Sequence, residues 1–391
     1  MGKFSTFAGS RKVKIFLLVF FVLLLGIIFS SCSTIYGLYC RSQIKSGLNT
    51  PGTFGKARLE VIQDIPVLHL YGTPEEMGRQ YGTLLRKSLS SLNGYLHAFV
   101  PAEKIESLIS AAKSREKNLP QEAVKELKAI SEASGVPYEV LLTFNITPKM
   151  ACSALAVWGK TTTDGEMILG RNADYYGFGL SDRGSMLIVY HPNEGKKVLS
   201  INFIGMIGAF TGINEDGVAF GNMLVFNSSE PEFNEDGVTI QLLLRQAAHK
   251  SSNVGEFGRY LIDQKHLISM NVMVADTKNA KILELGTVRS KEKNPVGDFL
   301  AVSNYFIDPD MGSGGFKCPR YDSLMRSVEE NSGKYNEKIM ENALRDAIIE
   351  GLNLQAVVFQ PSKMVMHISV NKIPAAEGPY REFNLKELFK D

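Results

Sequence analysis

The stretch from residue 151 to residue 175, ACSALAVWGKTTTDGEMILGRNADY, constrains the fold of this chain more than any other part of its sequence. Two apolar, strand-like runs lie on either side of the turn signal Thr163-Asp164-Gly165, and two short strands around a turn predict a β-hairpin. A hairpin returns its far end beside its start. We therefore expect the thiol of Cys152 to lie close to the side chains of Arg171 and Asp174.

These three groups suit a nucleophile at a chain terminus. A cut between Ala151 and Cys152 would leave Cys152 with a thiol and a free α-amine, whose unperturbed pKa is about 7.7 to 8.0. Such an amine can serve as the general base for the thiol. The charge of Arg171 would favour the thiolate, and Asp174 would hold the ammonium or orient the thiol. Spacing alone leaves a second interpretation open, a buried structural cysteine beside a loop ion pair.

The segment resembles the N-terminus of the mature chain in the choloylglycine hydrolase and isopenicillin N acyltransferase group (peptidase C45), a branch of the N-terminal-nucleophile (Ntn) hydrolases. The pattern of that group is a Cys followed by Thr or Ser, a Gly-rich turn, and then Gly-Arg-Asn-x-Asp. Here it reads Cys152-Ser153 followed by the run from Gly170 to Asp174. The chain departs from the pattern at Ser153, where Thr is commoner, and at Ala151, where Gly often precedes the cut.

Three later stretches extend the resemblance over most of the chain after residue 151. GINEDGVAFGNMLV (212–225) resembles a family hairpin that ends in an oxyanion-stabilising Asn, here Asn222. AVSNYF (301–306) resembles the strand end with a second active-site Asn, here Asn304, and CPRYDSLM (318–325) resembles a segment with a late Arg, here Arg320. Taken singly, these residues have ordinary interpretations as a turn residue, a loop cap and a helix start. An amide is nevertheless a good neutral oxyanion donor, worth about 2.7 to 4 kcal/mol.

The resemblance implies an α+β fold, the four-layer αββα sandwich of Ntn hydrolases, in which two stacked sheets are flanked by helices. Composition predicts a signal peptide or membrane anchor (1–31) and a linker (32–55), and the resemblance implies a helical pro-segment (56–151) and a catalytic domain (152–391). It also implies self-cleavage before Cys152, action on the linear amide bond of a small N-acyl amide or on an acyl thioester, and no cofactor. The cleaved pro-segment is expected to stay associated.

The first residues read as an export signal. Four basic residues and no acidic one precede or flank the apolar run IFLLVFFVLLLGIIF (15–29), which is short for a spanning helix of about 20 residues. The sequence FSSC that follows resembles a bacterial lipoprotein cleavage box, with Phe29 where Leu is usual, and predicts a lipid on Cys32. The alternative is an uncleaved anchor that continues to Cys40. Both predict an exported, membrane-attached protein that faces the periplasm or the exterior.

Composition excludes several other classes. The formal net charge of +2 falls to about −2 without the four basic residues of the leader, so a nucleic-acid binder is not expected. The six histidines are scattered without metal-binding spacing. Cys40 and Cys318 show no pattern of a zinc site or a disulfide framework. No metal and no nucleic acid are therefore predicted.

Apolar periodicity and turn signals predict the remaining elements. Thr73 and Pro74 give a helix start, and helices are expected at 74–99, 105–112, 121–134, 138–144, 239–250, 254–262, 321–330 and 336–350. Strands are expected at 184–191, 196–203, 204–213, 217–226, 270–276, 280–286, 300–304, 355–360 and 364–370.

Two other classes of function stay open. One is a binding or structural surface lipoprotein that keeps the Ntn fold and is never cleaved. The other is a cysteine protease of the papain type that uses a distant histidine, although the sequence signature of that class around its Cys is absent. Cys318 would be a competing nucleophile, but its Gly- and Pro-rich surroundings, GSGGFKCPR, favour a structural role.

Overall fold

The computed structural model describes residues 33–146, 151–177, 179–180, 183–227, 229–312 and 318–391. The leader and the predicted lipid site at Cys32 lie outside these residues. Among the described helices, none has the length and apolarity needed to cross a bilayer.

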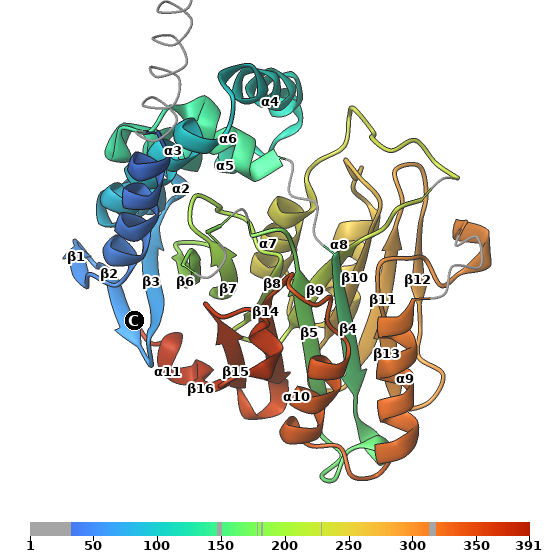
Figure 1. The fold of residues 1–391 in the computed structure, drawn as a ribbon. Helices are drawn as coiled ribbons and strands as arrows, with labels where there is room; N and C mark the ends of the chain where they lie inside the picture. The colour runs from blue at the N-terminus through green and yellow to red at the C-terminus, as the bar shows by residue number, and fades with distance from the viewer. Residues whose placement is uncertain (1–32, 147–150, 178, 181–182, 228, 313–317) are drawn as a thin grey trace, which may run out of the picture.

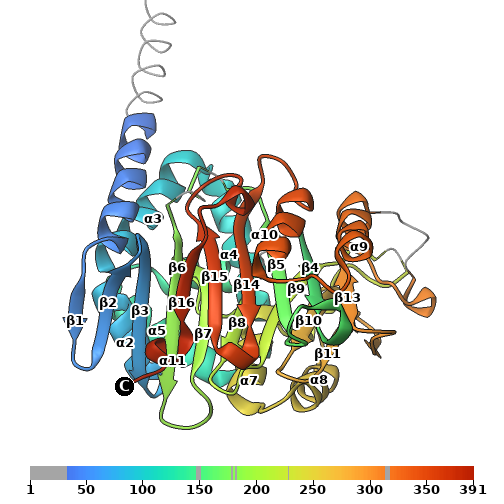
Figure 2. The same ribbon diagram turned by 90° about the horizontal axis from the view of Figure 1, so that it is seen from below.

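Two β-sheets form the centre of the molecule (Figures 1 and 2). The larger sheet has the strand order β1-β2-β3-β6-β7-β8-β9-β10-β11-β12, and the smaller has β13-β4-β5-β14-β15-β16. The strands of the larger sheet are β1 (Gly52–Phe54), β2 (Ala57–Ile62), β3 (Ile65–Gly72), β6 (Ser185–Pro192), β7 (Val198–Phe203), β8 (Thr211–Asn214), β9 (Ala219–Leu224), β10 (Met270–Ala275), β11 (Ala280–Leu285) and β12 (Ser290–Lys293). Those of the smaller are β4 (Ala151–Val157), β5 (Ile168–Asp174), β13 (Phe299–Val302), β14 (Asn353–Gln360), β15 (Val365–Val370) and β16 (Arg381–Asn384).

Helices cover the outer face of each sheet. The first group consists of α2 (Pro74–Leu84), α3 (Arg86–Phe99), α4 (Ala102–Arg115), α5 (Gln121–Ser134), α6 (Tyr138–Ile146), α7 (Ile240–Lys250) and α8 (Val254–Ile262), and the second of α9 (Pro319–Asn331) and α10 (Glu337–Asp346). The short α11 (Leu385–Leu388) lies near the C-terminus (Figure 1). One hydrophobic cluster fills the space between the larger sheet and the first group, a second lies between the sheets, and a third lies under α9 and α10. The predicted α+β class with two stacked sheets flanked by helices is confirmed.

The predicted hairpin around Cys152 is confirmed in detail. Strands β4 and β5 pair antiparallel, with Cys152 opposite Ala173 and Ala154 opposite Arg171. Because side chains alternate along a strand, Cys152 and Arg171 point between the sheets, whereas Asn172 points to the helical layer and donates to the carbonyl of Leu344. The sequence thus divides this motif between two faces of one sheet.

The helix-start signal at Thr73 is also confirmed. Its side chain accepts a hydrogen bond from the backbone of Glu76, and the Glu76 carboxylate accepts one from the backbone of Thr73, which forms a capping box. The predicted long helix is instead two helices, because the chain leaves helical geometry at Leu85. The run 204–213 is a strand only from Thr211 onward.

The expectation of a linker at 32–55 is wrong for its described part. Residues 33–48 are helical, and Cys40, Ile44 and Leu48 are buried at helical spacing. The expectation of a wholly helical segment at 56–151 is also wrong, because β2 and β3 occupy its first residues. Strand β3 pairs in parallel with β6, so this N-terminal region contributes strands to the larger sheet.

Candidate active site

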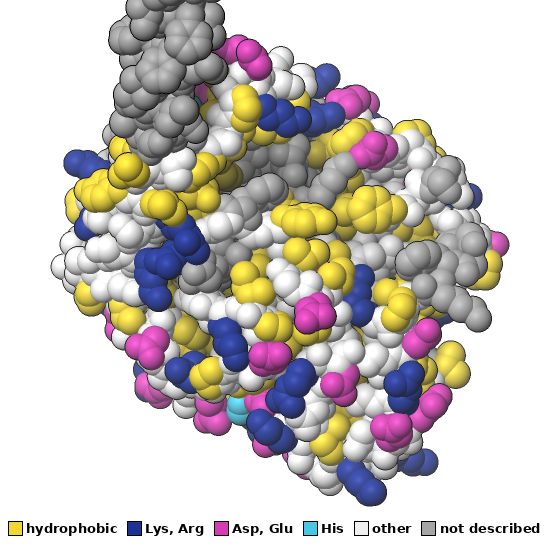
Figure 3. All heavy atoms as spheres, viewed as in Figure 1, with side chains coloured by type: hydrophobic (Ala, Val, Ile, Leu, Met, Phe, Trp, Pro, Cys, Tyr) yellow, Lys and Arg dark blue, Asp and Glu magenta, His cyan; other side chains and the backbone are white. Residues whose placement is uncertain are grey.

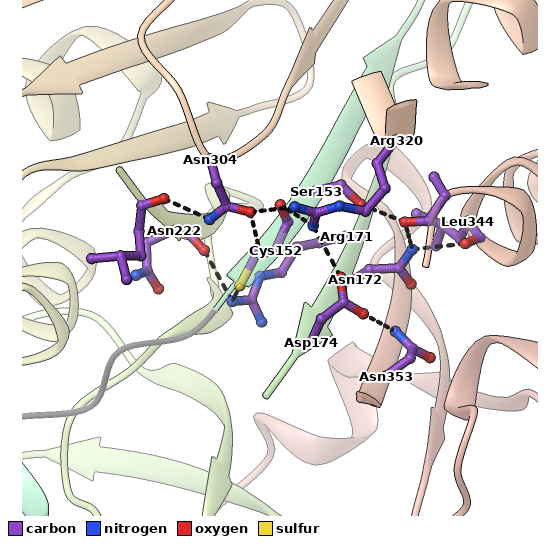
Figure 4. Close-up of polar contacts among 12 residues, drawn as sticks. Cys152, Ser153, Arg171, Asn172, Asp174, Asn222, Asn304, Arg320, Leu344 and Asn353 are labelled. Carbon is purple, nitrogen blue, oxygen red and sulfur yellow. Dashed lines mark hydrogen bonds and ion pairs between the residues drawn. The ribbon is translucent and has the colours of Figure 1, made fainter. Parts of the chain in front are cut away.

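Six residues that sequence analysis singled out lie in one hydrogen-bonded network, which Asn222 joins through its backbone carbonyl (Figure 4). They come from distant parts of the chain. Cys152 lies in β4, Arg171 and Asp174 in β5, Asn222 in β9, Asn304 just after β13 and Arg320 in α9. Ala151, the residue before the predicted cut, is described and pairs with Asp174 across the hairpin. The smaller sheet supplies the thiol, and the larger sheet closes over it.

Arg171 holds the sulfur of Cys152. Its Nη2 donates to Cys152 Sγ at 2.9 Å and to the backbone carbonyl of Asn222 at 3.0 Å, while its Nη1 donates to Thr211 Oγ1. The guanidinium is only 1% exposed, so its charge acts on the sulfur with little screening by water. Gly221 makes this approach possible, since a Cβ there would lie 2.8 Å from Arg171 Cδ.

A second set of contacts holds the backbone of Cys152. Its nitrogen donates to Asn304 Oδ1 at 2.9 Å, and its carbonyl accepts from Arg320 Nη1 at 2.9 Å. Arg320 Nη2 also donates to Asn304 Oδ1, at 2.7 Å. Because an arginine has donors only, the oxygen of the Asn304 amide must face Cys152. Its Nδ2 donates to the carbonyl of Leu224 at 2.5 Å.

Asp174 completes this second set. Its carboxylate accepts from Arg320 Nη1 at 3.1 Å and from Asn353 Nδ2 at 2.9 Å. Burial raises the pKa of Asp174, and the hydrogen bond from Asn353 and the charge of Arg320 oppose that rise. Asn353 is fixed in turn by the backbone nitrogen of Ala376, which donates to its Oδ1.

The thiol of Cys152 is completely buried. Burial raises its pKa, the charges of Arg171 and Arg320 lower it, and the carboxylate of Asp174 raises it. Since a buried thiolate is stabilised mainly by nearby positive charge, Arg171 is the group on which ionisation of this sulfur depends most.

Asn222 and Asn304 differ in the donors that they offer. The Nδ2 of Asn222 has a weak acceptor, Met270 Sδ at 3.6 Å, whereas the Nδ2 of Asn304 is engaged by a backbone carbonyl. Asn222 is 1% exposed and lies on the strand that faces Cys152. Both were predicted as oxyanion donors, and in the uncut chain only Asn222 has a donor bound this weakly.

Sequence reasoning missed Thr211 and Asn353. Neither lies in a stretch with unusual residue spacing; Thr211 opens a short strand, and Asn353 opens an apolar one. Each acts by holding another site residue, so only the spatial arrangement identifies it. Cys318 is buried at the start of α9.

Leu224, whose carbonyl accepts a hydrogen bond from Asn304, is one of the residues that line a cavity of about 290 Å³. Its lining is mostly apolar and includes Val225, Phe226 and Ile268, with Glu232 as the acidic member. Figure 3 shows hydrophobic side chains gathered near the middle of the viewed face, with most charged side chains below them. Among the described residues, no group of three or more His, Cys, Asp or Glu side chains is placed to hold a metal ion.

Two curated proteins resemble this chain in sequence. "Protein dcd1B" of Dictyostelium discoideum is 27% identical over 226 residues, which cover 49% of this chain and 44% of that protein. An uncharacterized protein of Archaeoglobus fulgidus is 22% identical over 328 residues, which cover 69% and 53%. The chain thus spans about half the length of these curated relatives.

Among solved structures, an N-acylethanolamine-hydrolyzing acid amidase ortholog from Caenorhabditis elegans matches with a TM-score of 0.43 and 14% identity, covering 54% of this chain and 93% of that one. A mutant conjugated bile acid hydrolase from Clostridium perfringens matches with a TM-score of 0.45 and 13% identity, covering 60% and 93%.

The family model described as acyl-coenzyme A:6-aminopenicillanic acid acyl-transferase matches residues 161–350. This range contains Arg171, Asp174, Asn222, Asn304 and Arg320 and begins after Cys152. The relationship that the motifs predicted is confirmed: residues 161–350 match the model of the acyl-coenzyme A:6-aminopenicillanic acid acyl-transferase family.

Proposed function

We propose that this protein is a self-processing cysteine amidohydrolase or acyltransferase with Cys152 as its N-terminal nucleophile. The observation that carries the proposal is the separate support of the two functional groups of Cys152. Arg171 binds the sulfur, and Asn304 binds the nitrogen, from opposite sides of one residue. A structural cysteine has no need of a charged partner for its sulfur and an oriented amide for its nitrogen.

Maturation would change the nitrogen of Cys152 from an amide into an amine. As an amide it has no basicity, so the uncut chain would be inactive. After cleavage of the bond to Ala151, the nitrogen would keep its donor contact with Asn304 Oδ1, and its lone pair would be free to accept the thiol proton. Burial raises the pKa of the thiol, which makes a base within the same residue more useful.

In the proposed reaction, Cys152 Sγ attacks the carbonyl carbon of the substrate while the thiol proton moves to the α-amine. The oxyanion would take a hydrogen bond from Asn222 Nδ2, whose acceptor among the described residues is a thioether sulfur. Collapse of the tetrahedral intermediate would break the C–N bond, and the leaving amine would take the proton from the ammonium. Water or a second amine would then release the acyl group from the thioester.

Substrates of this mechanism would be small N-acyl amides or acyl thioesters. The mostly apolar cavity that is lined by Leu224 supports binding of the acyl group of the substrate.

We further propose that the chain is exported and held at a membrane by residues 1–32, through a lipid on Cys32 or an uncleaved anchor, because of its basic and apolar leader. The N-terminal region is proposed to remain bound after cleavage.

Three of the six histidines have partners of their own, which favours this mechanism over a papain-type one in which one of these three is the base. His69 and His191 contact each other, at 3.2 Å, and His249 contacts Arg245. These histidines come from β3, β6 and α7, and burial lowers the pKa of His69 to about 3 and that of His191 to about 4. The low pKa values keep His69 and His191 neutral at neutral pH.

The test is release of amine from a panel of N-acyl amides by the full-length protein, compared with Cys152→Ala and Cys318→Ala. We expect turnover by the wild type and by Cys318→Ala and none by Cys152→Ala. Turnover that survives Cys152→Ala, or a wild type that binds the amides without releasing amine, would contradict the proposal. The second result would favour a binding lipoprotein that keeps the fold.

A further inference from the structure

The helix of residues 33–48 carries an unusual apolar surface at its N-terminal end. Large apolar side chains there are exposed, with Ile35 at 67%, Tyr36 at 53%, Leu38 at 52% and Tyr39 at 60%. Phe99, at the end of α3, is 44% exposed and lies against Gly37 of this helix, where a Cβ would clash with its ring. We call these five exposed residues the apolar tip.

Folding of the rest of the chain does not account for the apolar tip. The inner face of the same helix buries Cys40, Ile44 and Leu48 against the body of the protein. The outer face is apolar from Ile35 to Tyr39 and then becomes polar, since the exposed positions that follow include Ser42, Lys45 and Ser46. A contiguous exposed apolar patch marks an interaction site.

The preceding sequence indicates what covers the tip. The apolar run 15–29 ends six residues before Ile35, so any membrane that receives this run lies within a short chain length of the tip. Tyrosine side chains concentrate at the boundary between lipid and water, and the tip has two, Tyr36 and Tyr39. Lys45 and Lys87 are exposed beside the polar part of the helix, and Lys87 Nζ donates to Ser46 Oγ. Such charges attract anionic headgroups.

We propose that the apolar tip docks on the surface of a lipid bilayer, with the lipid–water boundary at the level of Tyr36 and Tyr39. The proposal rests on the membrane attachment proposed above, and it goes further by fixing which face of the folded body meets the membrane. Figure 2 shows this helix (blue) at one edge of the molecule. The body would therefore stand on the membrane at this edge and not lie flat on it.

The same contacts set a limit on the membrane-embedded part of the chain. Gly37 is covered by Phe99, and Cys40 is 3% exposed and lies beside Gly94 of α3. Because Gly37 and Cys40 pack against α3, a membrane-spanning anchor that continued to Cys40 would have to break these contacts. The sequence-based alternative of an anchor reaching Cys40 would then be shortened to end at the tip.

Depth-dependent fluorescence quenching tests the proposal with the full-length protein. Tyr39→Trp and Ser46→Trp place a reporter on the same face of one helix, because seven residues are nearly two turns, and separate the reporters by about 10 Å along the axis. The proteins are mixed with vesicles of phosphatidylcholine and phosphatidylglycerol, with and without bromine on the acyl chains. The single native tryptophan, Trp158, gives the same background in both.

We expect brominated lipid to remove most of the added fluorescence of Tyr39→Trp and little of that of Ser46→Trp. Docking is overturned if the two reporters respond alike. It is also overturned if the reporter at 39 is shielded from aqueous acrylamide but not quenched by lipid, which would mean that a second copy of the chain covers the tip.

Sedimentation of the same samples with the vesicles distinguishes membrane attachment of the chain from docking of the apolar tip. Protein that fails to sediment with vesicles overturns both the attachment and the docking, whereas protein that sediments with an unquenched reporter at 39 overturns docking alone. Turnover of a soluble N-acyl amide by both variants should equal that of the wild type, because neither residue belongs to the candidate active site. The outcome is therefore independent of the proposed chemistry.

Discussion

The sulfur and the nitrogen of Cys152 have different partners, so single substitutions should separate the two roles of this residue. Arg171 donates to the sulfur, and the nitrogen donates to Asn304, whose oxygen also accepts from Arg320. Substitution on the sulfur side should alter ionisation of the nucleophile. Substitution on the nitrogen side should alter the base.

Replacement of Arg171 by Gln should raise the pKa of the Cys152 thiol. Burial already raises that pKa and the arginine charge opposes the rise, so loss of the charge should shift the pKa further upward. The thiolate fraction at neutral pH falls, and the acidic limb of the pH–rate profile moves to higher pH. The rate of alkylation of mature enzyme by iodoacetamide, measured against pH, checks the shift. Arg381→Gln, on a distant strand, is the control, and an unchanged profile for Arg171→Gln would refute the assignment.

Replacement of Asn222 by Ala should slow turnover by about 100- to 1000-fold, the usual effect of losing one oxyanion donor. Folding should change little, because the only side-chain hydrogen bond described for the Asn222 amide is weak. Asn172→Ala is the matched control. Its amide donates to the carbonyls of Leu344 and Ala347, so it should lose stability and keep its rate while folded. The reverse pattern for the two variants would exclude the role given to Asn222.

At the scale of elements, the close approach of β9 to β5 positions Arg171. Gly221 of β9 lies over the aliphatic part of that side chain. The side chain is attached to β5 at one end, and its guanidinium donates to Thr211 and Cys152 at the other. A methyl group at position 221 would clash with this side chain. The distance between the two sheets at this point therefore helps to position Arg171.

Gly221→Ala should push the Arg171 side chain away from Cys152 and lower turnover strongly. The strain of overpacking should cost about 1 to 3 kcal/mol of unfolding free energy. Gly184→Ala is the control, since a Cβ there would meet its nearest atoms at 3.5 Å. Urea unfolding and amide turnover measure the two effects. A Gly221→Ala protein with wild-type turnover would mean that the spacing is not critical.

The sequence predicted the elements whose signals are local. The hairpin of β4 and β5, the capped start of α2 and the helices α5, α7 and α8 follow from turn residues, caps and apolar periodicity. It missed β1 to β3 and the helix of residues 33–48. That helix lies in a Ser- and Gly-containing stretch whose buried face is short, and β3 is stabilised by pairing with β6, more than 110 residues away. Such pairing leaves no local signal.

The candidate site shows the same limit. Cys152, Arg171 and Asp174 were predicted from the hairpin, and Asn222, Asn304 and Arg320 from the resemblance. All six lie together, whereas Thr211 and Asn353 required the spatial arrangement. The role of Asn304 also depends on geometry, because only the contacts show that its oxygen faces the nitrogen of Cys152.

At the scale of the whole molecule, the N-terminal region is built into the fold and is not an appendage. Tyr81 of α2 accepts from the backbone of Gly205, and the Asn145 side chain contacts both Gly205 and Ile207. Glu126 of α5 forms a buried ion pair with Arg245 of α7 at 2.7 Å. These contacts cross the proposed cut, so both pieces should remain together afterwards.

Glu126→Ala should lower the unfolding free energy by about 3 to 5 kcal/mol, because it leaves the charge of Arg245 buried without its partner. The exposed Glu122 of the same helix provides the control, Glu122→Ala, for which a change within about 0.5 kcal/mol is expected. Urea denaturation compares the two. Equal stability of both variants would show that the ion pair does not tie the N-terminal region to the rest of the chain.

The central claim is that Cys152 becomes a chain terminus whose amine activates its own sulfur. Intact-mass spectrometry of the purified full-length protein, run under denaturing conditions and compared with Cys152→Ala, tests it most directly. The account predicts a fragment of residues 152–391 in the wild type and in Cys318→Ala, which co-elutes with the N-terminal piece before denaturation, and no such fragment in Cys152→Ala. A wild type that turns over amides while every molecule keeps the bond between Ala151 and Cys152 intact would contradict it.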